Sequence, residues 1–204
     1  MSERKLQGLE PESVFRYFEE ICAIPHGSRN TKAISDYLVS FAKAHGLRCR
    51  QDESNNVVIF APGTCGLEDH ESVILQGHMD MVCEKRPDVE HDFTKDGLNL
   101  SVKDGYVSAN GTTLGGDDGI AVAYSLALLD STDIPHPALE VLVTVDEEIG
   151  LLGAFGLDCS VLSGKRMINM DSEAEGSLWI SCAGGLSAVS HIPVQRVAAE
   201  GEKL

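Results

Sequence analysis

Four separate segments of the chain place an imidazole or carboxylates where a strand is expected to end or a helix to begin. They contain His78 and Asp80, then Asp117 and Asp118, then Asp146 to Glu148, and last Asp171. None of these acidic residues has a lysine or arginine as its neighbour in the sequence. Burying several unpaired carboxylates together costs several kcal/mol for each charge, so a multivalent cation is expected among them.

One imidazole with several carboxylates suits zinc, with manganese or cobalt as alternatives, and suits calcium less because calcium prefers oxygen ligands. Taken singly, each residue also has an ordinary structural explanation. A histidine after a strand is often only hydrogen-bonded, and Asp117-Asp118 before a helix is ordinarily a cap and a partner of the helix dipole. Glu147-Glu148 could lie in a solvated loop, and Asp171 in a turn. Their joint occurrence favours the metal site.

Buried strands are expected to carry three of the four segments. The apolar runs 72–77, 139–145 and 166–170 each end directly before one of them, and short aliphatic runs of this kind are typical of buried strands. The helix expected at 120–129 is apolar on almost every side, which predicts a place in the interior. Open α/β sheets carry their functional residues beyond the carboxyl ends of the strands, so the four segments are expected to meet at one rim.

Helices and strands alternate along the rest of the chain. Helices are expected at 11–23, 31–46 and 151–157, strands at 47–50 and 56–60, and a hairpin with strands 98–102 and 106–109 that turns through Asp104-Gly105. This alternation predicts an α/β fold of three layers, α-β-α, with a mixed, twisted sheet flanked by helices on both faces.

Composition narrows the class of protein. The 204 residues are 43% hydrophobic, as in a globular protein, and 32 acidic against 16 basic residues give a net charge of −16. This charge argues against nucleic acid and anionic membranes as partners. The polar N-terminus and the lack of a long apolar stretch predict a soluble, cytoplasmic protein. Six scattered cysteines without a CxxC pair are expected to be reduced thiols.

Other catalytic and binding motifs are absent from the sequence. The chain has no HExxH, no GxSxG nucleophile elbow and no EF-hand spacing. The segment 115–119 lacks the lysine of a phosphate-binding loop, and its aspartates would repel phosphate.

The four segments resemble a known family pattern. The motifs HMD at 78–80, GGDD at 115–118, DEEIG at 146–150 and MD at 170–171 resemble those of the co-catalytic zinc exopeptidase superfamily, which includes carboxypeptidase G, tripeptidase and the carnosinases. The amino-acid sequences of 75–84 and 112–121 are similar to those of the bacterial aminoacyl-histidine dipeptidases, also called cytosolic non-specific dipeptidases.

The resemblance implies a role for each matching residue. Asp117 would bridge two zinc ions, His78 and Asp171 would complete one site, and Glu148 would belong to the other. Glu147 would be the general base, and Asp80 would orient the His78 imidazole. The resemblance also implies a cis peptide bond between Asp117 and Asp118.

The length departs from the family pattern. Members of the family are more than twice as long, so the resemblance implies that 1–184 form the N-terminal portion of the catalytic domain and that 185–204 begin a lid and dimerisation domain. The catalytic fold would then be incomplete at its C-terminus, with exposed apolar surface and a tendency to associate. The full-length protein would be a homodimer.

The missing half of the family's chain supplies a further zinc-binding histidine and an oxyanion-stabilising histidine, and no other histidine here lies in a matching motif. One zinc site would keep three ligands and the other only Asp117 and Glu148. We therefore expect one well-formed zinc site and little peptidase activity from this chain alone.

Three functions remain open at the level of sequence. The first is hydrolysis of dipeptides, including aminoacyl-histidine dipeptides. The second is a related aminoacylase or tripeptidase activity, which would use the same motifs. The third is an inactive fragment that binds metal.

Overall fold

The computed structural model describes residues 4–172, 175–185 and 188–195. The chain divides into two units, Met1–Ser172 and Glu173–Leu204. All helices and strands of the described residues lie in the first unit, and the ranges 175–185 and 188–195 contain none. Residues 186–187 and 196–204 of the expected lid segment lie outside the described residues. The domain boundary expected at 184–185 stays a prediction.

A mixed five-stranded sheet forms the centre of the first unit. Its strands lie in the order β1 (Arg48–Gln51), β2 (Val57–Ala61), β6 (Leu139–Thr144), β3 (Val73–His78) and β7 (Arg166–Asn169). The pairs β1–β2 and β2–β6 are antiparallel, whereas β3 is parallel to both β6 and β7. The α/β class with a mixed sheet is confirmed. Because β3, β6 and β7 are parallel, their carboxyl ends meet at one rim.

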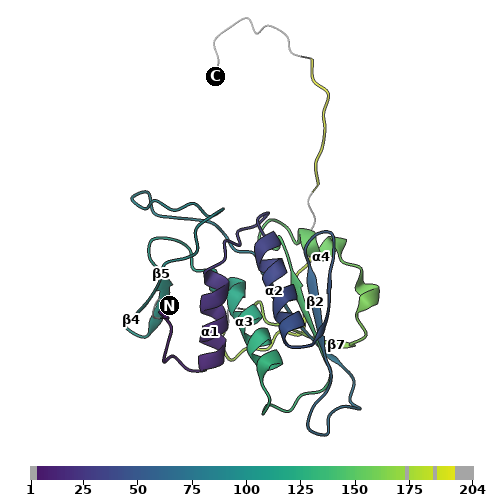
Figure 1. Ribbon diagram of the computed structural model, residues 1–204. Helices are drawn as coiled ribbons and strands as arrows, with labels where there is room; N and C mark the ends of the chain where they lie inside the picture. Colours follow the sequence, from purple (N-terminus) through teal and green to yellow (C-terminus); the bar gives the residue numbers. More distant parts are fainter. Residues whose placement is uncertain (1–3, 173–174, 186–187, 196–204) are drawn as a thin grey trace, which may run out of the picture. The chain divides into compact units, whose positions relative to one another are not determined.

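Three helices cover one face of this sheet: α1 (Glu12–Cys22), α2 (Lys32–Ala44) and α3 (Gly116–Asp130) (Figure 1). Their buried side chains share one core with Val57 and Ile59 of β2. Helix α3 packs on both α1 and β3, and most of its side chains are buried, as the sequence predicts. Tyr124 is an exception, with 49% of its surface exposed.

The opposite face of the sheet has a thinner cover. Val58 of β2, Ile74 and Leu142 point to that side and contact Leu157 and Val161. These last two side chains belong to the segment that contains α4 (Leu152–Gly156) and the 3-10 helix η1 (Cys159–Val161). Helices therefore lie on both faces, as expected, but within the described residues the second face has only these two short ones.

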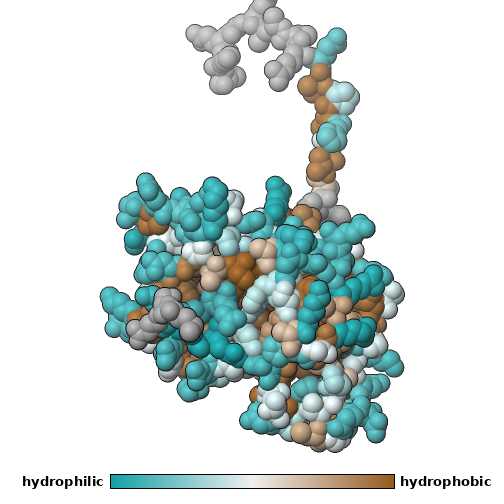
Figure 2. Space-filling model, in the orientation of Figure 1, coloured by the Kyte–Doolittle hydropathy of each residue, from teal (hydrophilic) through white to brown (hydrophobic). Residues whose placement is uncertain are grey.

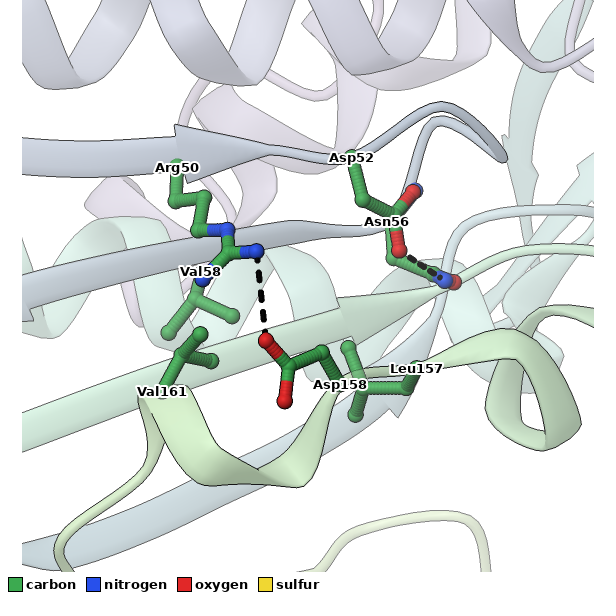
Figure 3. A pocket seen from close by; sticks show the side chains of 7 residues that line it. All are labelled: Arg50, Asp52, Asn56, Val58, Leu157, Asp158 and Val161. Atoms are coloured by element: carbon green, nitrogen blue, oxygen red, sulfur yellow. Dashed lines mark hydrogen bonds and ion pairs between the residues drawn. The ribbon is translucent and has the colours of Figure 1, made fainter.

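Asn56 ties this second face to the loop that follows β6. The fully buried Asn56 side chain donates from Nδ2 to the carbonyl of Gly153 at 2.9 Å, and its Oδ1 accepts the Val145 N–H at 3.1 Å. The small crevice beside Asn56 is lined in part by Arg50 and Asp158, which form an ion pair of 3.3 Å, and has a volume of about 10 Å³ (Figure 3). A space of this size holds one water molecule at most, so the crevice is structural.

The expected hairpin is present as β4 (Leu100–Lys103) and β5 (Tyr106–Ala109), with Lys103 paired to Tyr106. Its two-residue turn has φ of 52° at Asp104 and 82° at Gly105. Two positive φ values match the right-handed twist of the paired strands, which is why this dipeptide closes hairpins.

Apolar side chains are exposed on the outermost strand, β7. The burial expected for the strand at 166–170 is wrong, because β7 lies at an edge of the sheet and all four of its residues are exposed. Met167 and Ile168 keep 58% and 53% of their surface exposed. Beside them a hollow of about 760 Å³ is lined by residues of α1, α3 and the sheet, among them Leu75, Tyr124 and Met170. Figure 2 shows a largely hydrophilic surface with brown, hydrophobic patches on the face in view. The exposed apolar surface expected from the sequence is present.

Candidate metal centre

His78 is the last residue of β3 and is almost completely buried, with 1% of its surface exposed. Its Nδ1 donates to the backbone carbonyl of Asp80 at 3.0 Å, and its Nε2 lies 3.0 Å from Oδ1 of Asp117. Burial lowers the pKa of His78, but the bond to Asp80 and the charges of Asp118 and Asp80 outweigh it and raise the pKa to about 10. An ion bound at Nε2 would replace the proton there.

Asp80 follows two residues later, and its carboxylate is buried within the protein. It accepts hydrogen bonds from the Ser28 hydroxyl at 2.8 Å, the Glu147 N–H at 3.0 Å and the Glu148 N–H at 3.4 Å. Burial raises the pKa of Asp80, but the interactions with His78, Glu147 and Ser28 outweigh this effect and lower it. The carboxylate lies 3.5 Å from His78 Nδ1, so Asp80 contacts the imidazole through both its backbone and its side chain.

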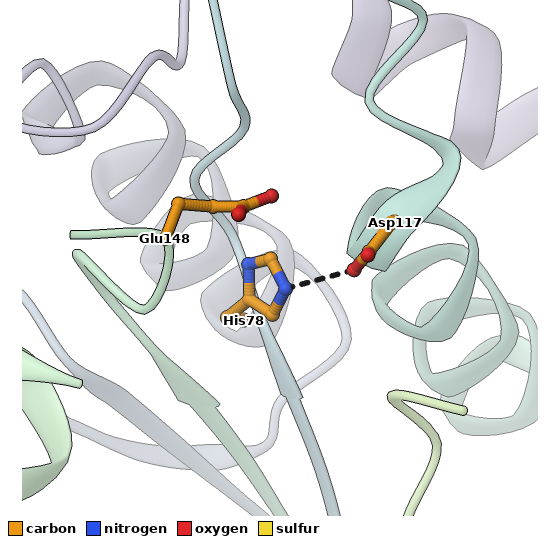
Figure 4. A group of neighbouring side chains, drawn as sticks. All are labelled: His78, Asp117 and Glu148. Atoms are coloured by element: carbon orange, nitrogen blue, oxygen red, sulfur yellow. Dashed lines mark hydrogen bonds and ion pairs between the residues drawn. The ribbon is translucent and has the colours of Figure 1, made fainter. Parts of the chain in front are cut away.

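Asp117 enters the site from the beginning of α3. Gly115 precedes this helix with φ of +67°, a conformation that glycine adopts without steric cost, and Asp117 itself is non-helical. The peptide bond between Asp117 and Asp118 is cis, as the family resemblance implies. Figure 4 shows the carboxylates of Asp117 and Glu148 on separate elements, both close to the His78 ring.

Glu147 and Glu148 lie in the tight loop that follows β6. The Glu147 carbonyl accepts the N–H groups of Gly150 and Leu151, each at 2.9 Å, which closes the loop. Glu147 Oε2 lies 3.9 Å from His78 Nε2. Burial, reinforced by neighbouring carboxylates, raises the pKa of both glutamates.

Asp171 completes the group from the end of β7. Its Oδ2 lies 4.0 Å from Nε2 of His78. The backbone here continues the parallel pairing, because the Met170 N–H donates to the Gln76 carbonyl at 3.0 Å. Asp171 therefore lies at the rim where the sequence predicts that the four segments meet, at the end of a strand parallel to β3.

Two overlapping sets of ligand atoms meet at His78. His78, Asp117 and Glu148 form one set, His78, Glu147 and Asp171 form the other, and the atoms of each set lie within 4.8 Å of one another. In the described part of the chain no lysine or arginine pairs with Asp117, Glu147 or Glu148. Burial is the main cause of the raised pKa values of the two glutamates, and the neighbouring carboxylates raise them further. An imidazole among crowded carboxylates fits a divalent cation well.

The structure thus brings together five of the predicted residues: His78, Asp117, Glu147, Glu148 and Asp171. The sixth, Asp80, contacts the His78 imidazole and the backbone of the two glutamates. The set that holds Asp171 contains Glu147, whereas the resemblance groups Asp171 with Asp117. The assignment of each residue to a particular ion stays a prediction.

The sequence does not single out Ser28, and it places Asp118 beside Asp117 without predicting its contact with the His78 backbone. Ser28 bonds to Asp80, and the buried Asp118 carboxylate accepts the His78 N–H at 3.1 Å. For Asp118 a signal was present in Gly77, because a glycine inside a strand marks a close approach by another group. No such signal points to Ser28.

Several known proteins are similar to this chain in sequence or structure. No model of a protein family matches it. The cytosol non-specific dipeptidase of Escherichia coli K12 is 42% identical over 194 residues, which are 95% of this chain and 40% of that protein. The crystal structure of the aminoacylhistidine dipeptidase from Vibrio alginolyticus matches with a TM-score of 0.82 and 44% identity, over 84% of this chain and 35% of that one. The chain is related to the aminoacyl-histidine dipeptidases.

A more distant match agrees with this relationship. A tripeptidase from Staphylococcus aureus gives a TM-score of 0.68 at 27% identity, over 81% of this chain and 44% of that one. The chain thus spans less than half the length of these relatives. No helix in the described residues is long and apolar enough to cross a membrane.

Proposed function

We propose that this chain carries metal ligands and the general base of a dipeptidase, and that the whole enzyme hydrolyses dipeptides with a free N-terminus, aminoacyl-histidine dipeptides among them. The observation that carries the proposal is the meeting of two ligand sets at His78. It occurs in a chain that is 42% identical to a dipeptidase.

Zinc is the proposed metal, with manganese or cobalt as alternatives. Asp117 would bridge two ions, His78 and Asp171 would hold the first, and Glu148 would hold the second. Bound ions would polarise the substrate carbonyl and lower the pKa of a bound water. Asp80 would hold His78 and the backbone of Glu147 in place for this role.

Glu147 would act as general base and then as general acid. Its carboxylate takes a proton from water while the water oxygen attacks the carbonyl carbon of the peptide bond. The same proton passes from Glu147 to the leaving nitrogen as the carbon–nitrogen bond breaks. A pKa raised by burial suits this exchange, because proton transfer is most effective when the pKa lies near the working pH.

The two ions would not be held equally by this chain. Three protein ligands serve the first ion, but only Asp117 and Glu148 serve the second. We therefore expect this chain alone to bind one zinc far more tightly than a second, and to show little or no hydrolysis.

Elemental analysis of the purified chain, beside a hydrolysis assay on an aminoacyl-histidine dipeptide, tests the proposal. One tightly bound zinc per chain is expected. Two tightly bound ions per chain would contradict the expectation that this chain supplies too few ligands for the second ion. If the chain binds none of zinc, manganese and cobalt, the proposed metal centre is contradicted. A tripeptide and an N-acylated amino acid belong in the same assay, because a tripeptidase is among the structural matches.

A further inference from the structure

The Asp118 carboxylate lies buried between the end of β3 and the first turn of α3, with 2% of the residue exposed. Its Oδ2 accepts the backbone N–H of His78 at 3.1 Å. Among the described residues Asp118 belongs to neither set of ligand atoms at the metal centre. Its carboxylate therefore bonds to the backbone of a ligand and does not itself join the ligands.

Gly77 makes this contact possible. A Cβ atom at Gly77 would lie 2.5 Å from Oδ2 of Asp118 and 3.0 Å from Cβ of Ala121. The first distance is far shorter than any ordinary van der Waals contact, so a side chain at Gly77 would displace the carboxylate. A glycine inside a strand weakens the strand, and here it admits a carboxylate to the strand backbone.

Two contacts join the same pair of segments. The backbone of His78 donates to the Asp118 side chain, and one residue away the His78 imidazole lies 3.0 Å from Asp117. The bond from the His78 backbone to Asp118 holds the end of β3 next to the first turn of α3. The distance between the His78 imidazole and Asp117 depends on how closely these two segments are held together.

We propose that Asp118 is a positioning residue of the metal centre, which holds the His78 backbone against α3 and so sets the separation of the His78 and Asp117 ligand atoms. The inference rests on the proposed metal-dependent function. Partners behind metal ligands typically change metal affinity 10- to 100-fold when they are removed.

The ordinary alternative is that Asp118 only interacts with the dipole at the beginning of α3. That role requires a negative charge, whereas positioning requires only an oxygen that accepts the His78 N–H. Asp118→Asn separates the two, because the amide keeps an acceptor oxygen and loses the charge.

The test measures zinc affinity of this chain by competition with a chromophoric chelator. Asp118→Asn is expected to bind zinc within about threefold of the unchanged chain. Asp118→Ala and Gly77→Ala are expected to bind roughly 10- to 100-fold more weakly. Asp130→Ala is the matched control, because Asp130 is the carboxylate at the other end of α3 and pairs with Arg16. Its zinc affinity should not change.

The visible absorption spectrum of bound cobalt is a second measurement. It would not change if Asp118 served only the stability of the fold. Binding of cobalt to Gly77→Ala should give shifted visible bands, and binding to Asp118→Asn should give unshifted ones. The inference would be overturned if Asp118→Ala or Gly77→Ala folds and keeps an unchanged zinc affinity and unchanged cobalt bands. It would also be overturned if Asp118→Asn loses as much zinc affinity as Asp118→Ala. If both the alanine variants fail to fold, the affinity and bands of Asp118→Asn decide. Failure of the unchanged chain to bind any of these metals would instead reject the proposed function.

Discussion

Oδ1 of Asp80 accepts the backbone N–H of Glu147 at 3.0 Å, which links the end of β3 directly to the loop after β6. The same carboxylate accepts the Glu148 N–H and the Ser28 hydroxyl. Three donors from two distant segments therefore depend on one buried side chain. The Asp80 carboxylate therefore holds the backbone of both glutamates in position.

Replacing Asp80 should disturb stability and metal binding together. Asp80→Ala removes the acceptor of three partly buried donors, so the free energy of unfolding should fall by about 2–4 kcal/mol. Zinc affinity should fall roughly 10- to 100-fold. Urea denaturation and chelator competition measure the two effects. Asp133→Ala, a change in an exposed loop, is the control, and a folded Asp80→Ala variant with unchanged zinc affinity would contradict the role of Asp80.

Ser28→Ala removes one of the three donors to Asp80. We expect a loss of about 1 kcal/mol in the free energy of unfolding, and Ser28→Thr should retain most of the stability because it keeps the hydroxyl. Ser40→Ala serves as control, because among the described residues the Ser40 hydroxyl bonds only to the Asp36 carbonyl within α2. Equal losses in Ser28→Ala and Ser28→Thr would show that the hydroxyl is unimportant.

Gly153→Ala should destabilise the loop that carries the glutamates. A Cβ at Gly153 would lie 2.4 Å from the Val145 carbonyl oxygen and 2.5 Å from Oδ1 of Asn56. Overpacking of this kind costs about 1–3 kcal/mol, measurable by urea denaturation. Gly156→Ala, in the same helix α4, is the matched control, since its Cβ would come no closer than 3.5 Å to Ser54. A Gly153→Ala variant as stable as Gly156→Ala would refute this account of the loop.

Stability of the chain in the presence of a chelator should fall as the pH rises from about 6.5 to about 10. Folding raises the pKa of His78 from its ordinary value of 6.5 to about 10, so the folded chain keeps a proton that the unfolded chain releases. The stabilisation is complete below pH 6.5 and is lost as the pH passes the folded pKa, with a slope of up to about 1.4 kcal/mol per pH unit. Urea midpoints at several pH values measure it, and His78→Gln should flatten the curve. An unchanged slope in that variant would assign the effect to other groups.

The exposed side chains of β7 should promote self-association. Changing Met167 and Ile168 to lysine should reduce the mass-average size in sedimentation runs over a range of concentrations, because lysine removes apolar surface and adds charge to an edge strand. Tyr106→Lys, at another exposed apolar side chain in β5, is the control. If the chain without these substitutions is monomeric at high concentration, the prediction is contradicted.

The parts of the fold that the sequence predicts are those governed by local pattern. All six residues of β6 are buried, and four of them are aliphatic. A short aliphatic segment of this kind predicts a buried strand without tertiary information. The meeting of His78, Glu147 and Asp171 follows from three parallel strands that end at one rim. The cis bond at Asp117 follows from the family resemblance and not from the local pattern.

What the sequence does not predict depends on tertiary contact. Ser28 reaches Asp80, and Asp118 reaches His78, across long stretches of chain. An aspartate at a helix start has an adequate local explanation as a cap, so its bond to a strand backbone becomes visible only when α3 and β3 are placed together. The thin second face of the sheet is likewise a result of packing, since short helices give weak periodic signals.

The ligand residues at the rim of the sheet also bear on the stability of the fold. His78, Asp117, Glu148 and Asp171 come from four segments that are far apart in the sequence but neighbours in space. An ion held by them would act as a reversible cross-link, closing loops that the unfolded chain leaves open. At a free concentration one hundred times its dissociation constant, such an ion adds about 2.7 kcal/mol to the stability of the fold. Supply of metal would then govern how long the chain survives proteases, apart from any part in turnover.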